Sequence, residues 1–189
     1  MQEDYRQFVR GINPDLLFEG LEALIVQMKL VDETKEADDP DELLDVLSVV
    51  YRYMLSNKSK ELVSFEAEKD ALLHLIALFE FLPYSKVQMD IRVTNPGVTV
   101  PGTFLYLVQE LVKVTIPSAI LEQNIKLYDD GTHLILSCVK NDKVSEEFSL
   151  ELPETLNHSY SHYTDHQISV EETDHTRSIF IPKIILNTD

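Results

Sequence analysis

The sequence predicts an α+β protein whose N-terminal half is helical and whose C-terminal half is a layered α/β domain. In the first half, apolar residues recur at spacings of three and four, as on one side of a helix. From Lys86 onward, apolar and polar residues alternate in short runs, which is typical of strands. We therefore expect a helical dimerisation region over residues 1–83 and an α/β domain over residues 84–189.

The N-terminal half predicts three helices. The first carries an apolar stripe from Phe8 to Leu30. The second begins at Pro40, because Asp39 can cap it, proline suits the first helical position and Glu42 completes a capping box. The third is capped by Ser64 and closed by Pro83.

Two helices with one-sided apolar stripes commonly pair with a second copy to form a four-helix bundle. We therefore expect a homodimer through the helical region. The predicted dimer interface consists of Ile12, Leu16, Leu17, Leu21, Leu24, Leu47, Val50 and Met54.

The C-terminal half predicts a mixed sheet with helices against one face. Val87, Met89, Ile91 and Val93 lie on one face of the first strand, and an Asp-Gly turn joins two later strands. The expected strands cover residues 86–93, 124–139 as a hairpin, 166–172 and 177–185, and the expected helices cover residues 103–114 and 152–163.

Composition excludes several classes of function. The net charge of -17 argues against a nucleic-acid partner and against binding to an anionic membrane surface. The single cysteine, Cys138, rules out an internal disulfide and fits a reducing compartment. No run of 18 apolar residues occurs, and the N-terminus lacks the features of a signal peptide. We expect a cytoplasmic protein, or the cytoplasmic part of a longer one, with no insertion of this chain into a membrane.

Three blocks in order resemble the LytS-like sensor histidine kinases of two-component signalling, especially the Bacteroidetes type. Residues 12–19 read INPDLLFE where the family reads INPHFLFN. Residues 47–69 and 170–184 resemble the family's second helix and its closing hairpin. The resemblance runs almost end to end. It implies a phosphoacceptor-like helical region followed by a histidine-kinase ATPase-like α/β sandwich.

The phosphoacceptor position has lost its histidine. Asp15 stands where the family has the reactive histidine, and Glu19 stands where the motif ends in asparagine. Autophosphorylation needs an imidazole nitrogen as nucleophile, and a carboxylate would still need an intact ATP site. The two interpretations of Asp15 are a substitute phosphoacceptor and a solvated acid near a helix start, where the helix dipole favours it; we expect the second.

The family's ATP-binding helix resembles LVENAxKH, and the matching segment here is LVQELVKVT. One register keeps the acid as Glu110 and places Leu111 at the asparagine that holds Mg²⁺. The register shifted by one keeps Lys113, but it places Gln109 at the acid and Glu110 at the asparagine. Either register lacks the metal ligand on which phosphoryl transfer depends.

The phosphate-binding lid is also altered. Leu150 and Leu152 occupy the segment in which the family has a Gly-x-Gly loop, and no glycine follows Thr132. The basic residue that the family places after that loop corresponds to Asn157. The resemblance therefore implies that binding of ATP and Mg²⁺ is lost.

Other candidate sites have ordinary structural interpretations. His158, His162 and His166 recur every four residues, but a predicted strand interrupts the helix that would bring them together, and no Cys or carboxylate joins them. His74 and Cys138 are expected in the core. We expect no metal and no cofactor.

The leading hypothesis is a catalytically inactive histidine-kinase-like protein that acts as a dimeric scaffold or regulator in two-component signalling. Its expected partners are a second copy of itself and either an intact sensor kinase or a response regulator. The alternative is an atypical but active ATP-dependent histidine kinase. A third hypothesis is a small-ligand sensor that reuses the former nucleotide pocket.

Overall fold

A computed structural model describes residues 18, 20–23, 25–26, 40–82, 86–115, 122–139 and 154–185. For residues 113–115 and 154–155 it describes the backbone only. Several predicted positions lie outside the described residues: Ile12, Asp15, Leu16, Leu17, Leu24, Leu150 and Leu152.

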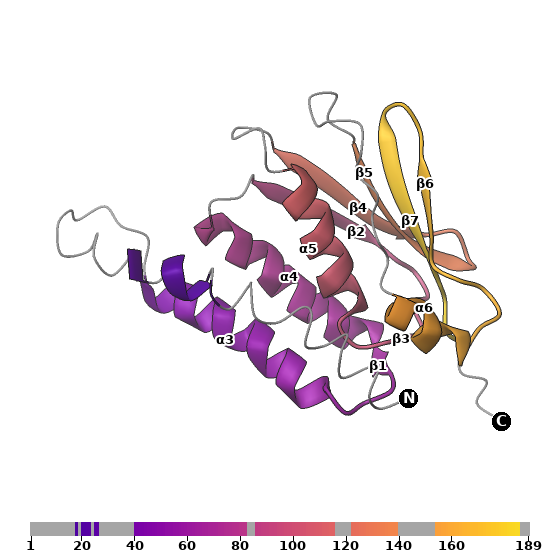
Figure 1. Cartoon of the computed structure of the whole chain (residues 1–189), viewed down its shortest axis with the longest axis horizontal. Coiled ribbons are helices and arrows are strands. Elements are labelled where there is room, and N and C mark those ends of the chain that lie inside the picture. The colour runs from indigo at the N-terminus through magenta and orange to yellow at the C-terminus, as the bar shows by residue number, and fades with distance from the viewer. Residues whose placement is uncertain are drawn as a thin grey trace.

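The described elements follow the predicted order (Figure 1). The helices are α3 (Pro40–Asn57), α4 (Phe65–Phe81), α5 (Thr103–Thr115) and α6 (Glu154–Ser161). The strands are β1 (Val63–Ser64), β2 (Val87–Arg92), β3 (Val98–Thr99), β4 (Gln123–Asp129), β5 (His133–Val139), β6 (Ser169–Glu172) and β7 (Thr176–Pro182).

The predicted starts of two helices are confirmed. The helix α3 begins at Pro40, with Asp41 and Glu42 in its first turn. Ser64 caps α4, and its hydroxyl accepts a hydrogen bond from the Ala67 amide at 3.3 Å. Acidic residues in the first turn of each helix also complement the positive end of the helix dipole.

The predicted mixed sheet is confirmed. Five strands are ordered β2-β4-β5-β7-β6; the pair β2 and β4 is parallel, and the other neighbours are antiparallel. The hairpin between β4 and β5 turns at Gly131, whose φ of 98° is favourable for glycine. A separate short pair joins β1 to β3 and connects the helical segment to the start of α5.

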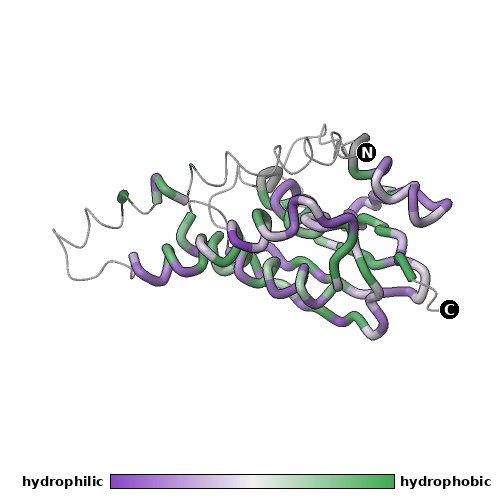
Figure 2. Tube along the Cα trace, turned by 90° about the horizontal axis from the view of Figure 1, so that it is seen from below, coloured by the Kyte–Doolittle hydropathy of each residue, from purple (hydrophilic) through white to green (hydrophobic). Residues whose placement is uncertain are grey.

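Helices cover one face of the sheet. The helix α4 contacts β2 and α5, and it also contacts α3, which lies farther from the sheet (Figure 1). Hydrophobic and hydrophilic residues alternate along the helices and strands, as expected where each element buries one side (Figure 2). None of the helices in the described part of the chain is long and apolar enough to cross a membrane.

One hydrophobic core runs across the predicted boundary at residue 83. It contains buried residues of α3 and α4 together with residues of the sheet, α5 and α6. Leu47, Val50 and Met54 belong to this core and are 4%, 0% and 6% exposed within a single chain. The helix α3, which carries them, packs against α4, and α4 in turn contacts the sheet. A dimer interface formed by these three residues stays a prediction, and little of their surface is left for a second copy.

Candidate functional site

The candidate site is built around α5, the helix that carries Gln109, Glu110 and Leu111. Its start is set by Gly102, whose φ of 82° lies in the left-handed region that favours glycine. The adjacent pairing of Val63 with Thr99 places the beginning of α5 against the beginning of α4. The helix α5 packs beside α4, on the side of the sheet that the helices cover (Figure 1).

The first turn of α5 is held by a carboxylate from another helix. Glu68 of α4 is fully buried and accepts hydrogen bonds from the Gly102 and Phe104 amides, both at 2.9 Å. The Tyr53 hydroxyl of α3 donates to the same carboxylate. The amides at a helix start have no partner within the helix, so Glu68 satisfies donors that would otherwise be left unpaired in the core.

Burial raises the pKa of Glu68 from its ordinary value of 4.5 to about 7. The hydrogen bonds from Tyr53, Gly102 and Phe104 oppose this effect, since each favours the charged form. The group is therefore balanced between its protonated and ionised forms close to neutral pH.

A second buried network holds the same turn from the side of α6. The Tyr160 hydroxyl lies 2.7 Å from the Thr99 hydroxyl and 3.3 Å from the Thr103 hydroxyl. The Thr103 hydroxyl in turn donates to the Val100 carbonyl at 2.7 Å. Burial raises the pKa of Tyr160 to about 12, so this phenol remains neutral. The start of α5 is thus fixed by α3, α4 and α6 together.

The three predicted site positions on α5 have different environments. Leu111 is 2% exposed and belongs to the hydrophobic core. Gln109 is 3% exposed, and its side chain forms no hydrogen bond with another described residue. Glu110 is half-buried and does interact with the rest of the chain. A buried amide with no partner among the described residues is unusual, because burial removes its hydrogen bonds to water.

Other residues singled out from the sequence have structural contacts. The Asn157 side chain accepts a hydrogen bond from the Ile168 amide at 3.0 Å and so joins α6 to the segment before β6. Cys138 is buried, as predicted, and burial raises the pKa of its thiol. The predicted core residue His74 is only half-buried, and its Nδ1 lies 2.8 Å from the Asp70 carbonyl oxygen.

The histidines do not form one group. His158 and His162 face each other with ring centroids 4.7 Å apart, whereas His166 lies 6.0 Å from His133. In the described ranges, no three His, Cys, Asp or Glu side chains gather where they could hold a metal ion.

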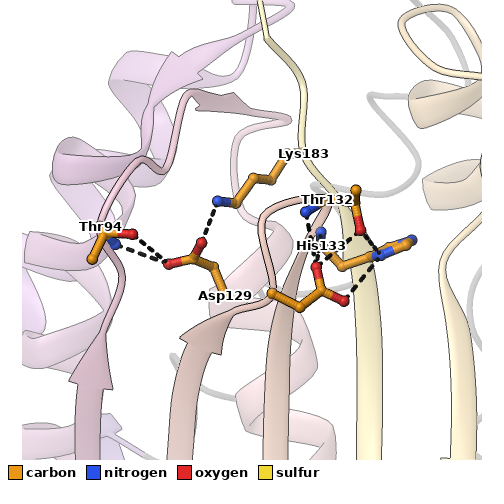
Figure 3. Close-up of polar contacts among 6 residues, drawn as sticks. Thr94, Asp129, Thr132, His133 and Lys183 are labelled. Atoms are coloured by element: carbon orange, nitrogen blue, oxygen red, sulfur yellow. Dashed lines mark hydrogen bonds and ion pairs between the residues drawn. The ribbon is translucent and has the colours of Figure 1, made fainter.

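A polar cluster at one end of the sheet was not expected from the sequence (Figure 3). Asp129 forms an ion pair with Lys183 at 2.6 Å and accepts hydrogen bonds from the amide and the hydroxyl of Thr94. The Lys183 side chain is only 3% exposed. The hydrogen bond from Lys183, aided by Thr94, lowers the pKa of Asp129 to about 2. This cluster ties together the ends of β2, β4 and β7.

Asp130 is also occupied by contacts within the chain. It accepts hydrogen bonds from the His133 amide at 2.7 Å and from the Thr132 amide at 2.8 Å, which close the hairpin turn (Figure 3). These bonds lower the pKa of Asp130 to about 2. Both aspartates therefore serve structural contacts and have few acceptor positions left for chemistry.

Glu68 was also missed by the sequence analysis, although a signal for it exists. It lies at helical spacing with Phe65, Leu72 and Leu75, so an acid interrupts an otherwise apolar stripe. A charged residue at a core position implies buried donors nearby. The sequence does not say that these donors belong to α5.

No family model and no curated protein sequence matches the chain. Among solved structures, it aligns with a bacterial phosphotransferase at 10% identity and a TM-score of 0.47, over 89% of this chain and 90% of the other. It aligns with the histidine kinase AdeS of Acinetobacter baumannii at 13% identity and a TM-score of 0.41, over 88% and 96% of the two chains.

A third alignment is with the histidine kinase ThkA, solved in complex with the response regulator protein TrrA. Its identity is 14% and its TM-score is 0.36, over 94% of this chain and 64% of the other. These TM-scores are too low to carry an argument about function.

Proposed function

We propose that the chain is a cytoplasmic, histidine-kinase-like signalling protein that does not transfer phosphate and acts by binding other proteins. The observation that carries the proposal is the set of side chains on α5. In one register of the resemblance, the metal-ligand position is Leu111, an apolar residue packed in the core. Mg²⁺ requires oxygen ligands, and leucine has none to offer.

The other register gives the same conclusion by a different route. It places Gln109 at the position of the acid and Glu110 at the position of the asparagine. An amide side chain does not exchange protons near neutral pH, so Gln109 is unsuited to assist proton transfer. Two further changes also argue against phosphoryl transfer: Asp15 replaces the family's reactive histidine, and the lid segment has no glycine.

The proposal is tested by titrating the full chain with Mg-ATP in a calorimeter and by incubating it with labelled ATP. We expect no binding in the micromolar range and no incorporated label. Asp15→His is the informative variant, because it restores the nucleophile without altering α5. Label in either protein, together with micromolar binding, would overturn the proposal and favour an atypical active kinase.

The proposed partners are a second copy of the chain and either an intact sensor kinase or a response regulator. Exposed apolar residues support a surface for the second copy: on α3, Leu44 is 46% and Leu55 is 59% exposed. Leu21, one of the predicted interface residues, is 40% exposed. Gly20, which precedes Leu21 in the sequence, lies directly against α3. An added Cβ at Gly20 would lie 2.8 Å from the Leu47 side chain.

Sedimentation measures the proposed dimer directly. The wild-type chain is expected to sediment as a dimer, and the double variant Leu44→Glu/Leu55→Glu as a monomer, because two charges in an apolar contact oppose association. Leu73→Glu on α4, at a position of similar exposure (44%), is the matched control and should remain dimeric. A monomeric wild-type chain would refute self-association.

Small-ligand binding beside α5 is a second candidate function, and Gln109 favours it. A buried amide with no partner in the described chain would gain a hydrogen bond from a ligand with donor and acceptor groups. A thermal-shift screen against such small polar molecules, repeated with Gln109→Met, tests this function. Stabilisation of the wild-type chain alone would support it, and an identical response of both proteins would count against it.

A further inference from the structure

Glu68 joins three helices through its two carboxylate oxygens. Oε2 accepts hydrogen bonds from the Tyr53 hydroxyl of α3 and from the Gly102 amide that precedes α5. Oε1 accepts a hydrogen bond from the Phe104 amide inside the first turn of α5. The side chain belongs to α4 and is 0% exposed, so it has no contact with bulk water.

The burial of this carboxylate makes its contacts depend on one another. If α5 moved away while Glu68 stayed buried, the oxygens would lose donors without gaining water, which is strongly unfavourable for a carboxylate. Separation of either α3 or α5 therefore has to admit water to Glu68. Water at the carboxylate also competes with the donors that remain.

We propose that Glu68 is a latch between α3 and the start of α5, so that the contacts of Tyr53, Gly102 and Phe104 with its carboxylate open as one cooperative unit. A partner that displaces α3 then loosens the first turn of α5 without touching it. Among the described residues, the titratable side chains of other elements that interact with Glu68 are Tyr53 of α3 and Tyr160 of α6. Burial raises the pKa of Tyr160, and the charge of Glu68 adds to this effect. The latch does not depend on whether the chain binds ATP. A result that contradicts the latch therefore leaves the proposed function unaffected, and the reverse also holds.

Residue-resolved amide hydrogen exchange on the full chain tests the latch through Tyr53→Phe. This change removes one donor on α3 and leaves both amides of the α5 turn intact. We expect the Gly102 and Phe104 amides to exchange about tenfold faster or more, the effect of losing one hydrogen bond to a charged acceptor. Tyr51→Phe, on the same helix and also half-buried, is the matched control and should leave both amides unchanged.

The Leu136 amide in the central strand β5 separates a local effect from a global one. The latch predicts a smaller change at Leu136 than at Gly102 and Phe104. An equal acceleration at all three amides, or unchanged exchange at the α5 turn, would overturn the proposal.

Glu68→Gln provides a second, independent arm. In a latch, Tyr53→Phe adds nothing once Glu68 is replaced, so the double variant should exchange at the rate of Glu68→Gln alone. Multiplicative effects of the two changes would show independent contacts and would contradict the proposal. If Glu68→Gln does not fold, the comparison of Tyr53→Phe with Tyr51→Phe still decides the question.

Discussion

Glu68 is expected to make the protein less stable as pH rises from about 4.5 to 7. Its pKa is about 7 in the folded chain and 4.5 as its ordinary value, which represents the unfolded chain. Between these values the folded state binds more protons than the unfolded state, so the free energy of unfolding falls as pH rises. The stabilisation is complete below the unfolded pKa and is lost as pH passes through the folded pKa. A shift of this size corresponds to about 3 kcal/mol.

Urea unfolding at pH 5 and pH 8 measures this effect in the wild-type chain and in Glu68→Gln. Other groups also titrate over this range, so the informative quantity is the difference between the two proteins. That difference in unfolding free energy should change by about 2 to 3 kcal/mol in favour of the variant at the higher pH. Asp129 and Asp130, whose pKa values are about 2, do not contribute in this window.

Glu66→Gln is the matched control, because Glu66 lies on the same helix and its side chain is 67% exposed. Its pH dependence should match that of the wild-type chain. Parallel curves for the wild-type chain and Glu68→Gln would refute the reasoning, since they would show that burial does not shift the pKa of Glu68. If the variant does not fold, the carboxyl of Glu68 can be titrated by NMR in the wild-type chain, where a midpoint near 4.5 would give the same refutation.

Four further substitutions test local geometry. Gly97→Ala should destabilise the chain by about 2 kcal/mol or more in urea unfolding, because φ is 69° and an added Cβ would lie 2.5 Å from the Ile184 carbonyl oxygen. Gly131→Ala, with φ 98° and open space around it, should have the smaller effect of backbone strain alone. Gln109→Met should raise the free energy of unfolding by about 1 kcal/mol in the same assay, because it removes a buried amide that has no partner among the described residues. A lower free energy of unfolding would indicate that the amide has a partner. Lys183→Met removes the ion-pair partner of Asp129. The ionised Asp129 stabilises the folded chain above its ordinary pKa of 3.8, and this stabilisation is lost as pH falls through about 2. Acid unfolding of the variant, monitored by circular dichroism, should therefore begin at a higher pH than that of the wild-type chain.

Local chemistry explains why the elements could be predicted from the sequence. Ser64 caps α4 through a residue only three positions away, and Gly131 closes a turn between adjacent strands. The alternation from Val87 to Val93 depends only on strand geometry. The parallel pairing of β2 with β4 was not predicted, because register between distant strands depends on how the intervening helix packs.

The candidate site was predicted only in part. The sequence identified α5 and the unusual residues Gln109, Glu110 and Leu111, because the resemblance rests on consecutive letters. It did not identify Glu68, whose amide partners are 34 and 36 positions away. The ion pair between Asp129 and Lys183 joins residues 54 positions apart and was missed for the same reason.

The sequence by itself determined the order of the elements, the acidic character of the chain and the side chains that α5 offers to a ligand. Only the tertiary structure decided which of these side chains are covered. Leu47, Val50 and Met54 are buried in the core of a single chain, and their role in an interface between copies stays a prediction. An apolar stripe states that a surface must be buried and does not state against what. That choice depends on packing between elements far apart in the sequence, and packing also brings Glu68 to the start of α5.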